Sequence, residues 1–179
     1  MKNSLCFIMV LFTTLSWSQK NNEVFEDGYI VMLTNDTLVG QIKILKEIDA
    51  YNKVVFKDTK NRVKTYNASQ LLEYFYFGNT YVSAYYENKP CFFKLLIGGN
   101  VKLFKLMART GGQEPELVFF ALPKGEDEVI KLDEDKLNKQ LQQLFKVNET
   151  LKYKLSKQKN TPLHSDTLHY YFMAFNYQN

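Results

Sequence analysis

Short apolar and aromatic runs, separated by turn residues, dominate the chain from about residue 25 to residue 132. The runs "YIVMLT" and "TLVGQIKIL" flank Asn35-Asp36, and further pairs of runs flank Lys60-Asn61, Gly78-Asn79, the glycine turn at 98–100 and the loop "PKGEDE". The runs are rich in Val, Ile, Thr, Tyr and Phe, which suit the half-buried faces of strands. The spacing predicts four or five successive hairpins, hence an antiparallel β meander that forms a small barrel or a sandwich.

Two runs have patterns that leave alternatives open. In "YFYF" (74–77), Phe75 and Phe77 share one face and Tyr74 and Tyr76 share the other, so the strand is either covered on both faces or displays its tyrosines. The run "KPCFFKLLIGG" could also form a short helix closed by glycine. We favour the strand, because Gly98-Gly99 is a good tight-turn pair and "VKLFKL" alternates cleanly after it.

From about residue 133, the apolar residues recur at the spacing that is typical of helices. Leu137, Leu141, Leu144 and Phe145 recur at helical spacing, and Leu151 and Leu155 repeat it after a break near 147–149. Acidic residues at 133–135 match the start of a helix, with an aspartate cap, and lysines crowd the end.

A last helix follows Pro162. Ser165 is its expected cap, and its apolar face would include Leu168, Tyr171, Phe172 and Phe175. No linker separates the helices from the strands. The sequence therefore predicts one α+β domain over residues 19–179, in which two or three C-terminal helices pack on the antiparallel sheet.

The first 18 residues have the layout of a secretory signal peptide. Lys2 precedes an apolar run from Leu5 to about Leu15, and Ser16 and Ser18 stand at −3 and −1 of a cleavage before Gln19. The run is too short to span a bilayer, although a retained anchor is the alternative. We expect a periplasmic or extracellular protein without an integral membrane span once the signal is removed.

Charge and cysteine usage narrow the function classes. The formal net charge of +4 falls to +3 without Lys2, and the lysines are spread along the chain, which does not favour nucleic-acid binding. Cys6 leaves with the signal, so Cys91 remains alone and no internal disulfide is expected. A buried thiol is the simplest interpretation of Cys91, and a nucleophile or an intermolecular disulfide is the alternative.

The pattern as a whole resembles a group of secreted Bacteroidota proteins. The similar segments are "DGYIVMLTNDTLVGQIK", "VVFKD", "VKTYNASQLLEYFYFG", "YVSAYY", "FFKLLIGGNVKLFKL" and "LNKQLQQLFKVNETLKYKL", and the resemblance extends over most of the mature chain. The resemblance implies export and a β-rich domain with C-terminal helices, and it implies no particular activity. Relatives often carry a Cys-Pro pair where this chain has Asn148-Glu149, so no role of that cysteine transfers.

No motif in the chain points to a specific catalytic or metal chemistry. His164 and His169 are five residues apart, which is wrong for a ligand pair on one helix face. The acidic stretch "GEDEVIKLDEDK" lacks the alternating oxygen ligands of a calcium loop, and a solvated turn followed by a helix cap explains it. We expect no catalytic residue, metal or cofactor, and a hydrolase without a recognisable motif is the alternative.

Tyrosines and one threonine are the candidate functional residues. Tyr74, Tyr76, Tyr81, Tyr85 and Tyr86 would contact a protein or a sugar if they are exposed, and would fill the core if they are not. The triplets Asp-Thr-Leu at 36–38 and 166–168 match a short O-glycosylation pattern, with Thr37 the better candidate. We therefore predict a non-catalytic binding or envelope-associated structural protein, with another envelope protein as its expected partner.

Overall fold

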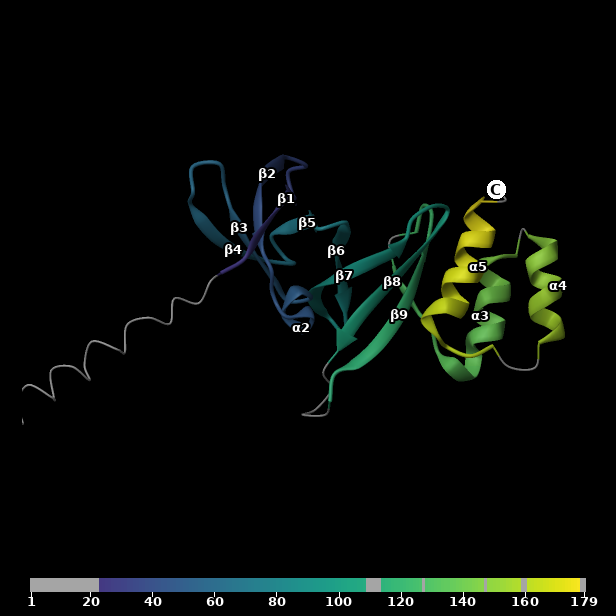
Figure 1. Ribbon diagram of the computed structural model, residues 1–179. Coiled ribbons are helices and arrows are strands. Elements are labelled where there is room, and N and C mark those ends of the chain that lie inside the picture. The colour runs from purple at the N-terminus through teal and green to yellow at the C-terminus, as the bar shows by residue number, and fades with distance from the viewer. Residues whose placement is uncertain (1–22, 109–113, 127, 147, 159–160, 178–179) are drawn as a thin grey trace, which may run out of the picture.

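The protein is a ten-stranded antiparallel sheet, curled into a half-barrel and followed by helices (Figure 1). The computed structural model describes residues 23–108, 114–126, 128–146, 148–158 and 161–177. The α+β prediction, with an antiparallel β region before C-terminal helices, is confirmed. Of the two architectures left open by the sequence, the structure is closer to the barrel, but the sheet remains open on one side.

Ten strands follow one another along the sequence. Their bounds are β1 (Phe25–Met32), β2 (Thr37–Lys43), β3 (Lys53–Lys57), β4 (Val63–Asn67), β5 (Leu71–Tyr76), β6 (Asn79–Tyr86), β7 (Lys89–Ile97), β8 (Val101–Ala108), β9 (Glu116–Pro123) and β10 (Ile130–Lys131). Their order in the sheet is β10-β9-β8-β7-β6-β5-β1-β2-β3-β4. A short helix that the sequence pattern did not predict, α2 (Glu47–Ala50), connects β2 to β3.

The connection from β4 to β5 explains the curl of the first five strands. Strand β4 is at the edge of the sheet, yet β5 pairs with β1, on the far side of β2 and β3. Four strand spacings in a flat sheet span about 19 Å, whereas the three residues between Asn67 and Leu71 bridge at most about 14 Å. The connection is itself a turn, because the N–H of Gln70 donates to the carbonyl of Asn67 at 3.1 Å. The sheet must therefore bend until its edge approaches β5.

The first two hairpins share one kind of turn, which differs from the predicted two-residue Asn35-Asp36 turn. In the β1–β2 hairpin, Met32 pairs with Asp36 across a three-residue loop that ends at Asn35, whose φ is 66°. The β3–β4 hairpin repeats this arrangement between Asp58 and Arg62, with Asn61 at φ 61°. A three-residue loop needs a left-handed residue at its third position, which asparagine tolerates.

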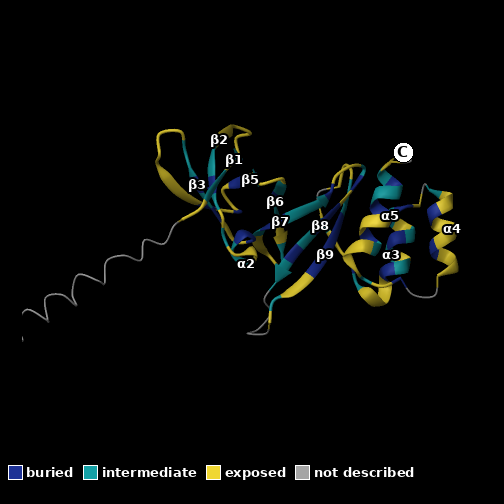
Figure 2. Ribbon diagram, in the orientation of Figure 1, coloured by how far each residue is buried: buried dark blue, intermediate teal, exposed yellow. Residues whose placement is uncertain are grey.

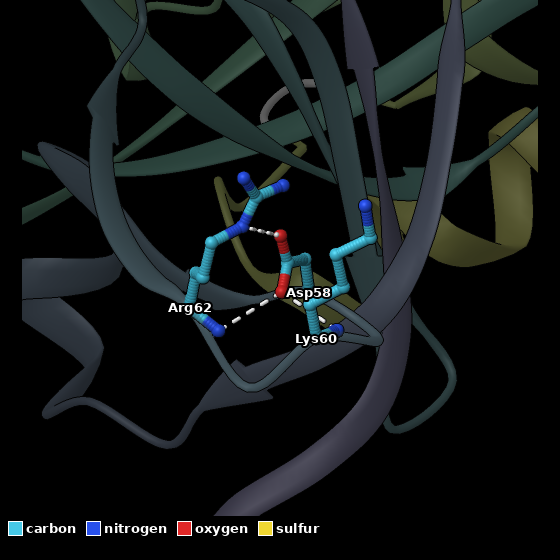
Figure 3. A network of polar contacts seen from close by, with 3 residues as sticks. All are labelled: Asp58, Lys60 and Arg62. Atoms are coloured by element: carbon cyan, nitrogen blue, oxygen red, sulfur yellow. Dashed lines mark hydrogen bonds and ion pairs between the residues drawn. The ribbon is translucent and has the colours of Figure 1, made fainter.

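The β3–β4 turn is reinforced by one carboxylate. One oxygen of Asp58 accepts from the backbone N–H groups of Lys60 and Arg62, each at 2.9 Å, and its other oxygen accepts from Nε of Arg62 at 2.7 Å (Figure 3). The backbone bond to Arg62 is the main cause that lowers the pKa of Asp58. The Asp58 carboxylate thus stabilises this turn and is occupied within it.

The next two hairpins have two-residue turns in which both central residues are left-handed. They are Phe77-Gly78, at φ 48° and 72°, and Glu87-Asn88, at φ 50° and 62°. The sequence placed the first of these turns one residue later, at Gly78-Asn79. The error arose because Phe77, a residue that rarely adopts positive φ, occupies the first central position.

Three helices cover one face of strands β7–β9. They are α3 (Leu137–Leu144), preceded by a 3₁₀ turn (Glu134–Lys136), α4 (Glu149–Lys157) and α5 (Ser165–Tyr177). Their predicted apolar residues share a core with Leu103, Phe119 and Ala121 of the sheet, and all are buried except Leu144, which is partly buried. Figure 2 shows how buried and exposed positions alternate along these helices. The predicted caps are wrong in part: Asp133 makes no capping bond, and α5 begins after His164, whose Nδ1 accepts from the N–H of Asp166 at 3.4 Å.

Strands β7–β9 therefore separate two apolar cores. Val118 and Phe120 belong to the core inside the half-barrel, whereas Phe119 and Ala121 belong to the core under the helices. The strand interpretation of "KPCFFKLLIGG" is confirmed by β7. Because both faces of these strands are covered, each contains consecutive buried apolar residues, namely Phe92-Phe93 in β7, Leu103-Phe104 in β8 and 118–121 in β9.

Candidate functional site

Three of the five candidate tyrosines are buried, which corrects the hypothesis that they form a binding surface. Tyr74, Tyr76 and Tyr81 retain 1%, 9% and 3% of their accessible surface. The rings of Tyr74 and Tyr81 stack with centroids 4.6 Å apart, and the Tyr74 hydroxyl donates to the carbonyl of Ala50 at 2.5 Å. Burial raises the pKa of both phenols, so each hydroxyl keeps its proton. These tyrosines fill the core and satisfy their polar ends within it.

The other two candidate tyrosines lie towards the end of β6. Tyr85 is 69% exposed. Tyr86 is half-buried, and its ring meets Phe120 edge-on with centroids 5.5 Å apart. The sequence could not separate the two groups, because the alternation along β6 does not reveal that only the first half of the strand is enclosed by the curled sheet.

A cluster of ionisable groups lies between α2 and strands β7 and β8. Nζ of Lys105 is 2.7 Å from Oε1 of Glu47, which also accepts from the Tyr51 hydroxyl at 3.2 Å. Lys94 is opposite Lys105 in the register, and burial, followed by repulsion from Lys105, lowers the pKa of its amine. A lysine of this kind could serve an enzyme. None of these side chains lines the cleft described below, so we interpret the cluster as the contact that holds α2 on the sheet.

Cys91 is a poor candidate nucleophile. It is half-buried on β7, opposite Ala84, and burial raises the pKa of its thiol to about 11. The thiolate is the reactive form, and this environment disfavours it at neutral pH.

The described histidines and acidic side chains form no cluster of metal ligands. His164 and His169 are both exposed at the start of α5, and His164 lies 3.7 Å from the carboxylate of Asp166. Within the described ranges, no group of three or more His, Cys, Asp or Glu side chains is arranged to hold a metal ion. Asp127, in the middle of the acidic loop, lies outside those ranges.

An open cleft of about 780 Å³ lies on the concave side of the half-barrel. Its floor contains Phe93 and Phe104 from β7 and β8, and one wall is the second half of β6. Further lining residues come from the β4–β5 turn and from the loop that precedes β10. The lining residues are Leu33, Ala68, Ser69, Leu71, Leu72, Val82, Ser83, Ala84, Tyr85, Glu87, Asn88, Pro90, Phe93, Phe104, Leu122, Glu128 and Val129.

The polar residues of this cleft include two hydroxyls that are bonded within the protein and two exposed carboxylates. The hydroxyls of Ser69 and Ser83 donate within the protein, to Oδ1 of Asn67 and to the carbonyl of Leu71, each at 2.6 Å. The charged lining residues are Glu87 and Glu128, both exposed carboxylates, and Glu87 accepts a hydrogen bond from the Tyr86 side chain. The cleft is therefore mainly apolar with an acidic rim, although the whole chain carries a formal charge of +4.

Thr37, the candidate for sugar attachment, is exposed at the first position of β2. Thr167, in the second Asp-Thr-Leu triplet, is half-buried in α5. A bulky sugar needs open space, so the difference in exposure favours Thr37 over Thr167.

Comparison with known proteins identified no relative. Neither protein-family models, nor curated proteins, nor solved structures gave a match. Within the described residues, no helix combines the length and the apolar character that crossing a membrane requires.

The cleft was not foreseen from the sequence. Its lining comes from six separate segments, and the residues of β6 and β9 that contribute to it are ordinary strand residues. The only sequence signal was indirect: Leu33, Leu72 and Tyr85 are large apolar or aromatic residues next to turns, and each is exposed in the structure.

Proposed function

We propose that the protein is an exported, non-catalytic binding protein whose half-barrel cleft holds an apolar ligand. The observation that carries this proposal is the cleft of about 780 Å³, with Phe93, Phe104, Val82, Ala84 and Leu122 in its lining. A large apolar concavity is the usual form of a ligand site. Its size is within the range for such sites, about 300–1,000 Å³.

The chemistry of the lining supports binding rather than catalysis. A nucleophilic serine would need a base that takes its proton, whereas the hydroxyls of Ser69 and Ser83 donate to groups of the protein and no histidine lines the cleft. The two rim carboxylates disfavour anionic ligands, because the lining residues that the structure describes include no cation to balance them. A neutral or cationic apolar ligand fits best.

Export is the second part of the proposal, and it rests on the first 18 residues, which lie outside the described ranges. Their signal layout and the resemblance to secreted Bacteroidota proteins both support a periplasmic or extracellular site of action. The mass of the protein recovered from the native envelope tests this part. A chain that begins at Gln19 is expected, and a full-length chain confined to the cytoplasm contradicts export.

Binding in the cleft is tested with Nile red, a neutral apolar dye whose fluorescence rises when it leaves water. We expect the Ala84→Trp variant, which fills the cleft, to weaken dye binding at least about tenfold, equivalent to 1.4 kcal/mol. The matched control is Val39→Trp, because Val39 is 69% exposed on β2 and does not line the cleft. Equal dye binding by both variants and the wild type would show that the dye binds elsewhere and would remove support for the cleft.

A further inference from the structure

Strands β5 and β6 separate beside the cleft. Their ladder ends where Glu73 pairs with Val82, whereas β6 continues to pair with β7 as far as Tyr86. Beyond the separation, the Ser83 hydroxyl bridges to the carbonyl of Leu71 at 2.6 Å, and Tyr85 is 69% exposed. The end of β6 therefore has a partner strand on one side only, and its other edge borders the cleft.

The register shows which backbone groups lie on this edge. The two-residue turn Glu87-Asn88 joins Tyr86 to Lys89, and residues that flank such a turn exchange both hydrogen bonds. The backbone N–H and C=O groups of successive residues point to opposite edges of a strand. Those of Tyr86 and Ala84 therefore point towards β7, and those of Tyr85 point towards the opposite edge. The pairing of Tyr85 with Pro90 is consistent with this direction. Proline has no backbone N–H, so it suits a position opposite a residue with which it exchanges no hydrogen bonds.

The outer edge of β7, on the other side of this hairpin, is covered by another part of the protein. Strand β7 pairs with β8 only from Lys94 onward, so its first half also lacks a neighbouring strand. There the N–H of Phe92 donates to the carbonyl of Tyr51 at 2.8 Å, which covers the edge with the end of α2. The described backbone hydrogen bonds include no comparable contact to Tyr85. The edge of β6 at Tyr85 borders the cleft and, unlike the edge of β7, has no such contact among the described bonds.

We propose that an extended peptide segment of a partner protein occupies the cleft by adding a strand to β6 at Tyr85. The Tyr85 N–H and C=O would bond the backbone of the segment, and alternate apolar side chains would enter the cleft over Phe93 and Phe104. A lysine or arginine of the segment would meet Glu87 or Glu128 at the rim. This inference rests on the proposed function, since it names the occupant of the same cleft.

The observations favour a peptide over other apolar ligands. An unpaired strand edge offers a donor and an acceptor at strand spacing, which a peptide backbone satisfies and a hydrocarbon chain does not. The acidic rim favours a segment that carries a positive charge, which also disfavours fatty acids and other anionic amphiphiles. The edge is short, so the apolar floor must contribute much of the binding energy.

A pair of variants at one residue isolates the backbone donor. Tyr85→Pro removes the N–H at the open edge without removing a β6–β7 hydrogen bond, whereas Tyr85→Ala removes the side chain and keeps the N–H. The probe is a pool of heptapeptides, Lys-Xaa-Thr-Xaa-Thr-Xaa-Lys, in which Xaa is Val, Leu, Ile or Phe. We expect Tyr85→Pro to weaken binding of the pool at least about tenfold and Tyr85→Ala by less than about threefold.

Modified peptides give a second measurement that does not depend on the folding of a variant. Methylating backbone nitrogens removes donors on one edge of the peptide strand, so one of two pools, methylated at either odd or even positions, should lose binding. A pool with glutamate in place of both lysines should bind the wild type at least about tenfold more weakly, since like charges would meet at the rim.

The outcomes separate this inference from the proposed function. No binding of any pool, or equal binding of both methylated pools, overturns strand addition, while Nile red binding that is sensitive to Ala84→Trp still supports the cleft. Peptide binding that Ala84→Trp leaves unchanged contradicts both. A dimer of the chain alone that Tyr85→Pro abolishes would assign the edge to a second copy and overturn the partner segment.

Discussion

At the residue scale, two glycines face each other across strands β1 and β2. Gly28 pairs with Gly40 in the register. A Cβ on Gly28 would lie 2.2 Å from the carbonyl oxygen of Phe75, and a Cβ on Gly40 would lie 2.4 Å from that of Lys57. Both positions are closed by backbone atoms, which cannot move aside as a flexible side chain can. The pair therefore allows β1 and β2 to approach their neighbours closely enough for the sheet to curl.

Gly28→Ala should destabilise the fold by at least about 2 kcal/mol, because the added methyl group must displace a backbone carbonyl. Gly98→Ala is the matched control, since a Cβ there meets no atom within 4 Å, and we expect it to stay within about 0.5 kcal/mol of the wild type. Urea unfolding followed by circular dichroism measures both. Similar values for the two variants would contradict the close-approach argument.

The ion pair between Glu47 and Lys105 should make the stability of the fold depend on pH. The hydrogen bond from Lys105 is the main cause that lowers the pKa of Glu47 below its ordinary value of 4.5. A carboxyl whose pKa is lowered by folding adds stability above its unfolded pKa, and this contribution is lost as the pH falls through the folded pKa. The stabilisation is therefore present at neutral pH and disappears in acid.

We expect Glu47→Gln to lower the free energy of unfolding by up to about 1 kcal/mol at pH 7, given the partial exposure of the pair, and to have a smaller effect at about pH 3, which lies below the unfolded pKa of a glutamate. Glu149→Gln is the control, because the Glu149 side chain is 81% exposed and lies 3.5 Å from Lys152. Denaturant unfolding at the two pH values provides the comparison. A Glu47 effect of the same size at both pH values would point to lost packing of α2 instead of a lost charge.

Burial at single positions could be predicted from the sequence in the helices but not in strands β5 and β6. The buried faces of the C-terminal helices followed from spacing, because a 3.6-residue period fixes one face. The tyrosines of β5 and β6 could not be assigned in this way. Alternation gives two faces, but only the curl of the sheet decides that Tyr74 and Tyr81 are enclosed while Tyr85 is not.

At the scale of elements, one side chain fastens the last helix to the sheet. The amide of Asn176 in α5 acts as a strand backbone would: its Oδ1 accepts from the N–H of Val101 at 3.0 Å, and its Nδ2 donates to the carbonyl of Val101 at 2.8 Å. Gly99 makes room for this contact, since a Cβ there would lie 2.6 Å from the Asn176 side chain. The β7–β8 turn is thereby linked to the end of the chain.

Asn176→Ala should cost about 1–3 kcal/mol, because it leaves two partly buried backbone groups without partners. Asn79→Ala is the control, since its side chain makes one exposed bond, to the carbonyl of Phe77 at 2.9 Å. Hydrogen exchange should show faster opening of α5 in the first variant alone. Unchanged protection of α5 would mean that apolar packing, and not this amide, holds the helix.

Element type was predictable from the sequence, whereas the connections were not. Hairpins were placed correctly because strand runs and turn residues alternate regularly. The β1–β2 turn was one residue longer than predicted and the β5–β6 turn one residue earlier, since Asn35 and Phe77 adopt left-handed conformations that composition alone does not reveal. The short helix α2 was missed because four residues carry no helical period.

At the scale of the whole molecule, the two cores share strands β7–β9. The helices pack on one side of these strands and the half-barrel encloses the other, so neither core has a sheet of its own (Figures 1 and 2). Sequence could predict that helices cover the sheet. It could not predict the cleft, which arises where a curled sheet stays open and depends on contacts between distant segments.

A shared sheet implies that the cores unfold together. Phe172 is fully buried in the core under the helices, with its ring 5.3 Å from that of Phe145. We expect Phe172→Ala to destabilise the protein by about 3–5 kcal/mol. Tyrosine fluorescence reports mainly on the half-barrel core and circular dichroism at 222 nm on the helices. The two should still give coincident unfolding curves in urea, because losing the helices uncovers Leu103 and Phe119 on strands that the other core also needs. Curves that separate, with the helical signal lost first, would show that the half-barrel is stable without its helices.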